Sequence, residues 1–148
     1  MTLDDKDWEI LNILQEHSDY TTRQIAKSTL IPSTTINNRI RRLKNEGIIK
    51  KFTVELDNKK IGKSFTSYVL ISVDLAYLKQ KKRTKVSLAK EIKKIPNVER
   101  VDIVTGISDI IALVRAKDVD EFNKQILTKI SNMDGIKQTQ SMISLEVF

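Results

Sequence analysis

Cysteine is absent from this chain, and histidine occurs once, as His17. Without cysteine the chain can form no disulfide, no thiol nucleophile and no cysteine-based zinc site. A lone histidine at the end of a predicted helix is typical of a surface or capping residue. Because serine, aspartate and lysine then lack an evident base to activate them, we expect neither catalysis nor a bound metal or cofactor.

Long hydrophobic runs are missing as well. No apolar segment approaches the roughly 20 residues that a membrane-spanning helix needs. The opening sequence MTLDDKDWEI is acidic, unlike a signal peptide. Hydrophobic residues make up 40% of the chain and charged residues 30%, a balance typical of a soluble globular protein. We therefore expect a cytoplasmic protein with no membrane partner.

Two ligand-binding signatures are also lacking. Neither of the glycine-rich phosphate loops, G-x-x-x-x-G-K and G-x-G-x-x-G, occurs in the sequence. RNA recognition on a β-sheet requires aromatic side chains on the central strands, where bases stack. Residues 98–105 and 110–116, which we interpret as central strands, contain no aromatic residue. This composition disfavours RNA recognition by the sheet.

The net charge of +7 is unevenly distributed. Residues 1–30 contain three basic and six acidic residues, whereas residues 31–60 contain eight basic and three acidic ones. Residues 61–148 contain fifteen basic and ten acidic residues. A positive field concentrated in one segment is typical of a protein that binds a polyanion such as nucleic acid.

The positive segment includes residues 33–49, STTINNRIRRLKNEGII, which predict an amphipathic helix ending before a glycine. With a period of about 3.6 residues, Ile36, Ile40 and Leu43 fall on one face. Asparagine, arginine and threonine side chains, which can contact base edges and phosphates, occupy the outer face. That outer face contains no acidic and no aliphatic residue. On this segment alone, an ordinary helix with a solvated polar face remains the alternative.

The two preceding segments match the first helices of a helix-turn-helix domain. Residues 3–16 predict a helix with Asp4 as its N-cap. Residues 22–29 predict a short helix that begins with the capping box Thr21-x-x-Gln24. In a helix-turn-helix, the second helix of the pair enters the major groove. Here that helix is the one without acidic residues on its outer face, so the sequence favours binding to double-stranded DNA.

The turn before the third helix is Leu30-Ile31-Pro32. We expect Leu30 to face the core. Pro32 cannot continue a helix that needs its N–H. We expect the capping of the third helix to pass to Ser33.

Residues 48–56 partly alternate and are rich in β-branched side chains, which predicts a strand. The polar cluster 57–60 predicts a turn. We therefore place a helix-turn-helix domain of the winged type at residues 1–52. A linker strand or hinge is expected at 53–64, followed by a second domain at 65–148.

The second domain shows the pattern β-α-β-β-α-β. This order is typical of the ferredoxin-like fold, an antiparallel sheet covered by two helices on one face. The fold class is therefore α+β. Along the first strand, alternate residues from Phe65 to Val73 are expected on one face. The predicted strands are 65–74, 98–105, 110–116 and 136–148, and the predicted helices are 84–95 and 119–133.

Two loops of this domain leave alternatives open. Residues 79–85, KQKKRTK, carry five positive charges and form either a solvated loop and helix start or a secondary DNA contact. The turn Gly106-Ile107-Ser108-Asp109 is either a plain hairpin turn or a ligand site. In a ligand site, Asp109 would hold an ammonium group and backbone N–H groups would bind a carboxylate.

A set of short motifs runs along the chain. They are Leu3-Asp4…Asp7…Ile10-Leu11, Ile36…Arg39-Ile40…Arg42-Leu43…Gly47-Ile48-Ile49, Asp57…Ile61-Gly62, Pro96-x-Val98, Thr105-Gly106-x-x-Asp109 and Gly135-Ile136…Thr139-x-Ser141. In this order and spacing the sequence resembles the Lrp/AsnC, or feast/famine, family of prokaryotic transcriptional regulators over essentially its whole length. The resemblance implies a homodimer formed through the C-terminal sheets, assembling further to tetramers or octamers. It also implies a free amino acid as effector, bound at subunit junctions by Gly106, Ile107, Ser108, Asp109, Thr139 and Ser141.

We therefore predict a sequence-specific DNA-binding transcriptional regulator that an amino-acid effector modulates. Thr34, Asn38 and Arg41 are the predicted base readers, and Arg39 is predicted to be a positioning or phosphate-contacting residue. The full set of predicted DNA-binding residues is Ser33, Thr34, Thr35, Asn37, Asn38, Arg39, Arg41, Arg42, Asn45, Lys50 and Lys51. One alternative is an architectural, chromatin-like protein that coats DNA with little sequence choice. Another is a small enzyme or amino-acid-binding module whose N-terminal half serves only for docking.

Overall fold

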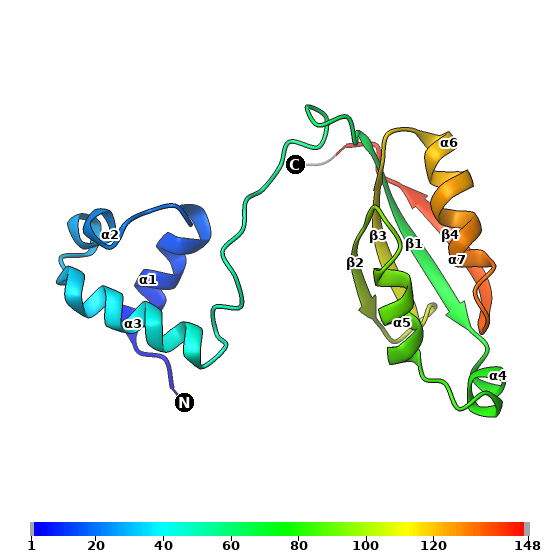
Figure 1. Cartoon of the computed structure of the whole chain (residues 1–148), viewed down its shortest axis with the longest axis horizontal. Helices are drawn as coiled ribbons and strands as arrows, with labels where there is room; N and C mark the ends of the chain where they lie inside the picture. Colours follow the sequence, from blue (N-terminus) through cyan, green and yellow to red (C-terminus); the bar gives the residue numbers. More distant parts are fainter. Residues whose placement is uncertain (1, 147–148) are drawn as a thin grey trace. The chain divides into compact units, whose positions relative to one another are not determined.

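A computed structural model describes residues 2–146 of the chain. The chain divides into two compact units, Met1–Glu55 and Leu56–Phe148. Figure 1 shows the helical first unit in blue to cyan and the sheet-containing second unit in green to red. Each unit buries a hydrophobic cluster of its own. The last two positions of the strand predicted at 136–148 lie outside the described residues.

The first unit contains three helices, α1 (Asp5–Glu16), α2 (Thr22–Thr29) and α3 (Ser33–Asn45). The predicted N-cap and capping box are confirmed. The Asp4 carboxylate accepts a hydrogen bond from the backbone N–H of Asp7 at 2.9 Å, and the Asp7 side chain accepts one from the N–H of Asp4 at 3.2 Å. Thr21 and Gln24 cap α2 in the same reciprocal way. These bonds satisfy donors that the start of a helix leaves without partners.

The turn between α2 and α3 differs from the prediction. Leu30 has a φ of 58° and its side chain is 92% exposed, so it does not face the core as we expected. The left-handed backbone at Leu30 reverses the chain, and Ile31 enters the core in its place. Pro32 rather than Ser33 is the N-cap of α3, and no side chain caps this helix. The prediction that Ser33 caps the helix was therefore wrong.

The strand predicted at residues 48–56 does not form. The backbone N–H groups of Ile48 and Ile49 both donate to the carbonyl of Leu43, at 2.9 and 3.1 Å, and so close the end of α3. A strand must pair its N–H and C=O groups with a neighbouring strand. No neighbouring strand lies beside this segment in the part of the chain that the structure describes, so its β-branched composition alone does not produce one.

The second unit contains a four-stranded antiparallel sheet with the strand order β2-β3-β1-β4. The strands are β1 (Phe65–Val73), β2 (Val98–Ile103), β3 (Ile110–Ala116) and β4 (Ile136–Ile143). This is the predicted ferredoxin-like topology, but β2 is an edge strand and β1 is central. The expectation that residues 98–105 are central was therefore wrong. Of the two aromatic residues of β1, Phe65 packs on Phe122 and Tyr68 is 42% exposed, and one exposed ring does not form a stacking platform.

Helices cover one face of the sheet (Figure 1). They are α5 (Lys85–Lys93) and a continuous helical segment made of α6 (Val119–Glu121), the π-helical turn η1 (Phe122–Leu127) and α7 (Thr128–Ser131). A short helix that we did not predict, α4 (Leu75–Gln80), follows β1. Asp74 caps it by accepting a hydrogen bond from the N–H of Tyr77 at 2.9 Å. Six residues are too few to show a helical period in the sequence.

The alternation predicted along β1 is confirmed. Ser67, Val69, Ile71 and Val73 are buried on the helix-covered face. Val69, Ile71 and Val73 pack with side chains of α5, β3 and the last helical segment into a single cluster. This packing holds the ends of β1, β2 and β3 in place, and these strand ends carry the turn from Gly106 to Asp109.

Candidate DNA-reading helix and effector turn

The outer face of α3 presents polar side chains without acidic ones. Ile36 and Leu43 are fully buried and anchor the helix on the core of the first unit. The exposed side chains are Thr34, Asn37, Asn38, Arg41, Arg42, Lys44 and Asn45, while Ser33 and Thr35 are half-buried. The face is therefore accessible, basic, and supplied with the amide and guanidinium groups that pair with adenine and guanine.

The beginning of α3 also has free backbone donors. Ile36 is the first residue of α3 whose backbone N–H donates a backbone hydrogen bond, to the carbonyl of Pro32 at 3.0 Å. No side chain caps the helix start, so the N–H groups of Thr34 and Thr35 have no acceptor among the residues that the structure describes. Uncapped N–H groups and the helix dipole together favour an anion such as a DNA phosphate.

Two of the predicted base readers are joined to each other. The Nη2 atom of Arg41 donates to Oδ1 of Asn38 at 3.1 Å, one turn along the helix. Both side chains are exposed. This bond holds the guanidinium over the outer face of α3 and reduces the side-chain freedom that DNA binding would otherwise remove.

Arg39 and Arg42 have partners inside the first unit. Nη1 of Arg39 lies 2.7 Å from Oδ1 of Asp4 and 2.7 Å from Oδ1 of Asp7. Nη2 of Arg42 lies 2.6 Å from Oδ2 of Asp7. Arg39, predicted as a positioning or phosphate residue, therefore ties α3 to the start of α1. Arg42 takes part in the same network while its side chain remains 42% exposed.

The network also sets the charge state of its carboxylates. Burial of Asp7 opposes ionisation, but hydrogen bonds from Arg39, from the backbone of Asp4 and from Arg42 outweigh it and lower the pKa of Asp7 below 3.8. The hydrogen bond from Arg39, more than any other contact, lowers the pKa of Asp4. The two carboxylates in turn raise the pKa of Arg39. All three groups are therefore charged near neutral pH.

Sequence reasoning placed Asp4 and Asp7 in a capped first turn and missed their contact with α3. The spacing of the acidic residues and of the arginines in the sequence could have indicated this contact. Asp4 and Asp7 lie three positions apart at the N-cap and in the first turn of one helix, and Arg39 and Arg42 lie three positions apart on another, so each pair can face the same side. Lys50 and Lys51, also predicted to bind DNA, are exposed and follow α3 in the segment where no strand forms.

The predicted effector turn lies between β2 and β3. Ile107 is 90% exposed at its tip, and Gly106 adopts a φ of 130°, which favours glycine. The backbone N–H of Asp109 donates to the carbonyl of Ile71 at 2.9 Å. The turn is thereby attached to the end of the central strand β1.

Asp109 has partners within this chain where we predicted the ammonium group of a ligand. Its Oδ2 accepts a hydrogen bond from the N–H of Val73 at 2.9 Å, and its Oδ1 forms an ion pair with the Lys85 ammonium. The hydrogen bond from Lys85, followed by that from Val73, lowers the pKa of Asp109. Asp109 therefore holds the turn against β1 and the start of α5. Sequence reasoning placed Lys85 in the basic run 79–85 and missed this contact.

Thr139 and Ser141, the remaining predicted effector residues, lie on β4 opposite Ile71 and Val69 of β1. Both are half-buried. The Thr139 hydroxyl lies 3.2 Å from that of Ser131 in α7. Ile71 thus connects the two halves of the predicted site, because its carbonyl binds Asp109 and its register partner on β4 is Thr139.

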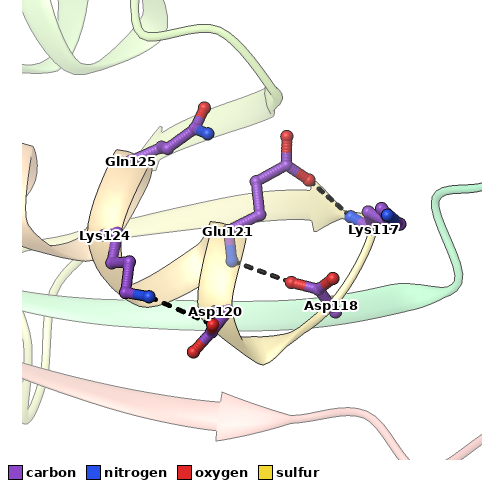
Figure 2. Close-up of a pocket in the computed structure, with 6 residues that line it drawn as sticks. All are labelled: Lys117, Asp118, Asp120, Glu121, Lys124 and Gln125. Atoms are coloured by element: carbon purple, nitrogen blue, oxygen red, sulfur yellow. Dashed lines mark hydrogen bonds and ion pairs between the residues drawn. The ribbon is translucent and has the colours of Figure 1, made fainter.

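A surface hollow of about 300 Å³ lies at the start of α6, apart from these residues. Figure 2 shows its carboxylates turned toward partners of this chain. Asp118 accepts from the N–H of Glu121 at 2.8 Å, Glu121 accepts from that of Lys117 at 2.6 Å, and Asp120 pairs with Lys124 at 3.1 Å. Because these groups already satisfy one another, we assign the hollow no ligand.

Two further findings concern residues 2–146. None of their helices is long and apolar enough to cross a membrane. No cluster of three or more histidine, cysteine, aspartate or glutamate side chains within this range is arranged to hold a metal ion.

The fold and the acid-free helix define a two-domain DNA-binding transcriptional regulator. The family model for winged helix-turn-helix DNA-binding domains matches residues 3–50, and the model for the Lrp/AsnC ligand binding domain matches residues 60–148. The chain belongs to the Lrp/AsnC family of transcriptional regulators.

Curated relatives match along nearly their whole length. The HTH-type transcriptional regulator FL11 of Pyrococcus furiosus is 34% identical over 145 residues, which cover 98% of this chain and 91% of FL11. An uncharacterized HTH-type transcriptional regulator of the same organism is 37% identical over 142 residues, covering 96% of this chain and 92% of the relative. Both relatives are HTH-type transcriptional regulators.

Solved structures share the fold. A transcriptional regulator of Neisseria meningitidis in complex with L-methionine has a TM-score of 0.86 at 21% identity, covering 98% of this chain and 91% of that one. LrpC of B. subtilis has a TM-score of 0.82 at 24% identity, covering 100% of this chain and 98% of LrpC. AsnC of E. coli has a TM-score of 0.82 at 22% identity, covering 99% of this chain and 95% of AsnC.

Proposed function

We propose that this regulator recognises specific DNA sequences through α3, with Thr34, Asn38 and Arg41 contacting base edges in the major groove. The observation that carries this proposal is the exposed, acid-free face of α3 together with the Arg41–Asn38 bond. An arginine pairs with guanine and an asparagine with adenine. The uncapped N–H groups at the start of α3, with Lys50 and Lys51, supply phosphate contacts that fix the position of the helix on the duplex.

The regulator binds DNA as a homodimer in this proposal. The face of the sheet that the helices leave open carries exposed or half-buried apolar side chains from three strands, namely Tyr68 of β1, Ile111 and Leu113 of β3, and Met142 of β4. A second copy of the chain would bury them. Two α3 helices in such a dimer read half-sites about one helical turn, roughly 34 Å, apart. Further assembly to tetramers or octamers is part of the same proposal.

We further propose that a free amino acid binds at the turn from Gly106 to Asp109 and modulates DNA binding. The backbone N–H groups of Gly106, Ile107 and Ser108 have no acceptor among residues 2–146, and the Lys85 ammonium pairs with Asp109 at the end of the same turn. Consecutive free N–H groups near a cation favour a carboxylate. The hydroxyls of Thr139 and Ser141 are candidate partners for the ammonium group. The L-methionine complex of the Neisseria relative supports this ligand class.

Binding-site selection from a random duplex library, with and without a mixture of amino acids, tests both parts. We expect one motif with two related half-sites to be enriched, and its occupancy to change with the mixture. Equal affinity for the enriched duplex and for random competitor would instead favour an architectural DNA-coating protein.

The effector part has a separate test in thermal unfolding. One or a few amino acids should raise the melting temperature by mass action, and Asp109→Ala should abolish the rise because the turn loses its attachments to Val73 and Lys85. Asp102→Ala, a half-buried carboxylate of the neighbouring strand β2, is the matched control. If none of the twenty amino acids shifts the wild-type melting temperature, free amino acids are not the effector.

A further inference from the structure

The positive charge of the second unit is concentrated on one stretch of its surface. Residues 74–95 contain eight basic and two acidic residues. The rest of the segment 61–148 contains seven basic and eight acidic residues. The whole positive excess of this unit therefore lies on α4, α5 and the turn between them, which follow one another beyond and along the sheet in Figure 1.

Some of these cations are engaged within the fold. Arg83 donates to Glu91 at 2.6 Å and to the carbonyl of Asp134 at 3.1 Å. Lys85 pairs with Asp109, and the Lys93 ammonium donates to the carbonyl of Val98 at 3.3 Å. These three side chains hold the helices in place, and the contact proposed below does not use them.

Five other lysines are exposed and form no ion pair with any carboxylate of residues 2–146. We call them the α4–α5 lysine surface: Lys79, Lys81, Lys82, Lys90 and Lys94. On α5, the buried residues Leu88 and Ile92 face the core. Lys90 and Lys94, four residues apart, share the opposite side of that helix.

The turn between the helices keeps the remaining lysines at the surface. Lys82 has a φ of 53°, a left-handed conformation, and its N–H donates to the carbonyl of Lys79 at 3.1 Å. Arg83 then anchors the chain on Glu91 and Asp134. The turn is thus tied down on both sides, and its lysines belong to a folded surface.

We propose that the α4–α5 lysine surface is a second contact for double-stranded DNA, distinct from α3, that binds phosphates of the duplex flanking the recognised site. The inference rests on the DNA binding of the first unit. A duplex presents one negative charge per about 1.7 Å of its axis. The ten residues from Lys85 to Lys94 span about 14 Å as a helix, so several phosphates lie within reach of a duplex running alongside.

Among polyanions, DNA is the partner that the charge pattern favours, because the first unit of the same chain already binds it in the proposed function. Once α3 is bound, the flanking duplex is present at a high effective concentration, so weak phosphate contacts contribute to affinity. Exposed lysine ammonium groups act as point charges and contribute no base reading. The surface therefore adds affinity and salt dependence without adding sequence preference.

The test compares two full-length triple variants that each remove three positive charges. Lys82→Gln, Lys90→Gln and Lys94→Gln change the proposed surface. Lys117→Gln, Lys124→Gln and Lys129→Gln change exposed lysines elsewhere on the second unit. Each is titrated over a range of salt against a selected binding site embedded in duplexes with short and with long random flanks. Far-ultraviolet circular dichroism and the melting temperature establish that both variants are folded.

On long duplexes we expect the first variant to bind about ten-fold more weakly than the control. The slope of log K against log salt concentration should fall in magnitude by about 2 to 3, since each lost phosphate contact removes about 0.9. On the short duplex the two variants should bind alike. Equal affinities and equal slopes on long duplexes would overturn the proposal and leave a solvated face or a site for another anionic partner. If the wild type binds no DNA even at low salt, the proposed function itself fails. This outcome is distinguishable from the failure of the second contact alone, in which the wild type still binds its selected site.

Discussion

The carboxylate of Asp7 in α1 is shared by two arginines of α3: its Oδ1 lies 2.7 Å from Nη1 of Arg39 and its Oδ2 lies 2.6 Å from Nη2 of Arg42. Asp7 is 1% exposed. The same residue closes the capping box at the start of α1. One buried carboxylate therefore fixes both the beginning of the first helix and the rotation of the proposed reading helix.

Removing this carboxylate should destabilise the first unit. We expect Asp7→Asn to lower the free energy of unfolding by about 1–3 kcal/mol, because it leaves two arginines without their buried partner. The arginines are partly exposed, and water therefore limits the loss. Asp5→Asn, an exposed acidic residue in the same first turn, should change stability by less than about 0.5 kcal/mol. Equal urea midpoints for the two variants would contradict the assignment.

Stability should fall in acid. The pKa values of Asp4, Asp7 and Asp109 are all lower in the folded chain than the ordinary value of 3.8. A carboxylate with a depressed folded pKa stabilises the fold above its unfolded pKa, and that contribution is lost as the pH falls through the folded pKa. We therefore expect a plateau near neutral pH and a loss of stability beginning near pH 4. Urea unfolding at pH values from 7 to 3 measures the free energy of unfolding. The difference in this free energy between the wild type and Asp7→Asn should become smaller toward pH 3.

Base reading by Arg41 has a matched test. Arg41→Lys keeps the charge but removes the planar fork that pairs with guanine. We expect it to weaken binding to a selected site by about 1–3 kcal/mol while leaving non-specific affinity nearly unchanged. Lys51→Gln should weaken specific and random duplexes alike and reduce the salt slope by about one. Mobility-shift titrations measure both, and unchanged specific affinity in Arg41→Lys would exclude this residue as a base reader.

A side chain at Gly135 should destabilise the second unit. It has a φ of 97°, and a Cβ there would lie 2.5 Å from Cδ2 of Leu78 in α4. Gly62, in the same unit, has a φ of 76° with nothing within 4 Å of its Cβ position. Gly62→Ala should therefore lower stability by about 1 kcal/mol through backbone strain alone. Gly135→Ala should lower it by at least about 1 kcal/mol more, because Leu78 must move. Thermal denaturation of the two variants compares them, and equal losses would indicate that Leu78 shifts freely.

Local patterns predicted most of the elements. The starts of α1 and α2 follow from their capping boxes, since these satisfy backbone donors with side chains three positions away. The apolar period of α3 and the alternation of β1 follow in the same way from burial of one face. Helix α4 escaped prediction because its six residues show too short a pattern.

Features that depend on distant partners were not predictable in this way. The β-branched residues 48–56 form no strand, because ladder hydrogen bonds require a neighbouring strand that this segment lacks in the described chain. The position of β2 at the sheet edge depends on which strands pair. Asp7 and Asp109 have their arginine and lysine partners on other helices, at sequence separations of 24 to 35 residues.

The sequence by itself determined the helix-turn-helix and ferredoxin-like organisation, the acid-free face of α3 and the concentration of lysine between residues 79 and 94. Each of these depends on residue type, on spacings shorter than one element or on the order of the elements along the chain. Only the tertiary structure decided which charged groups remain free. It paired Arg39 with Asp4 and Asp7, and Lys85 with Asp109, while it left Arg41 and the five residues of the α4–α5 lysine surface exposed. An ion pair requires two groups within about 4 Å, and folding alone sets that distance for residues far apart in the chain.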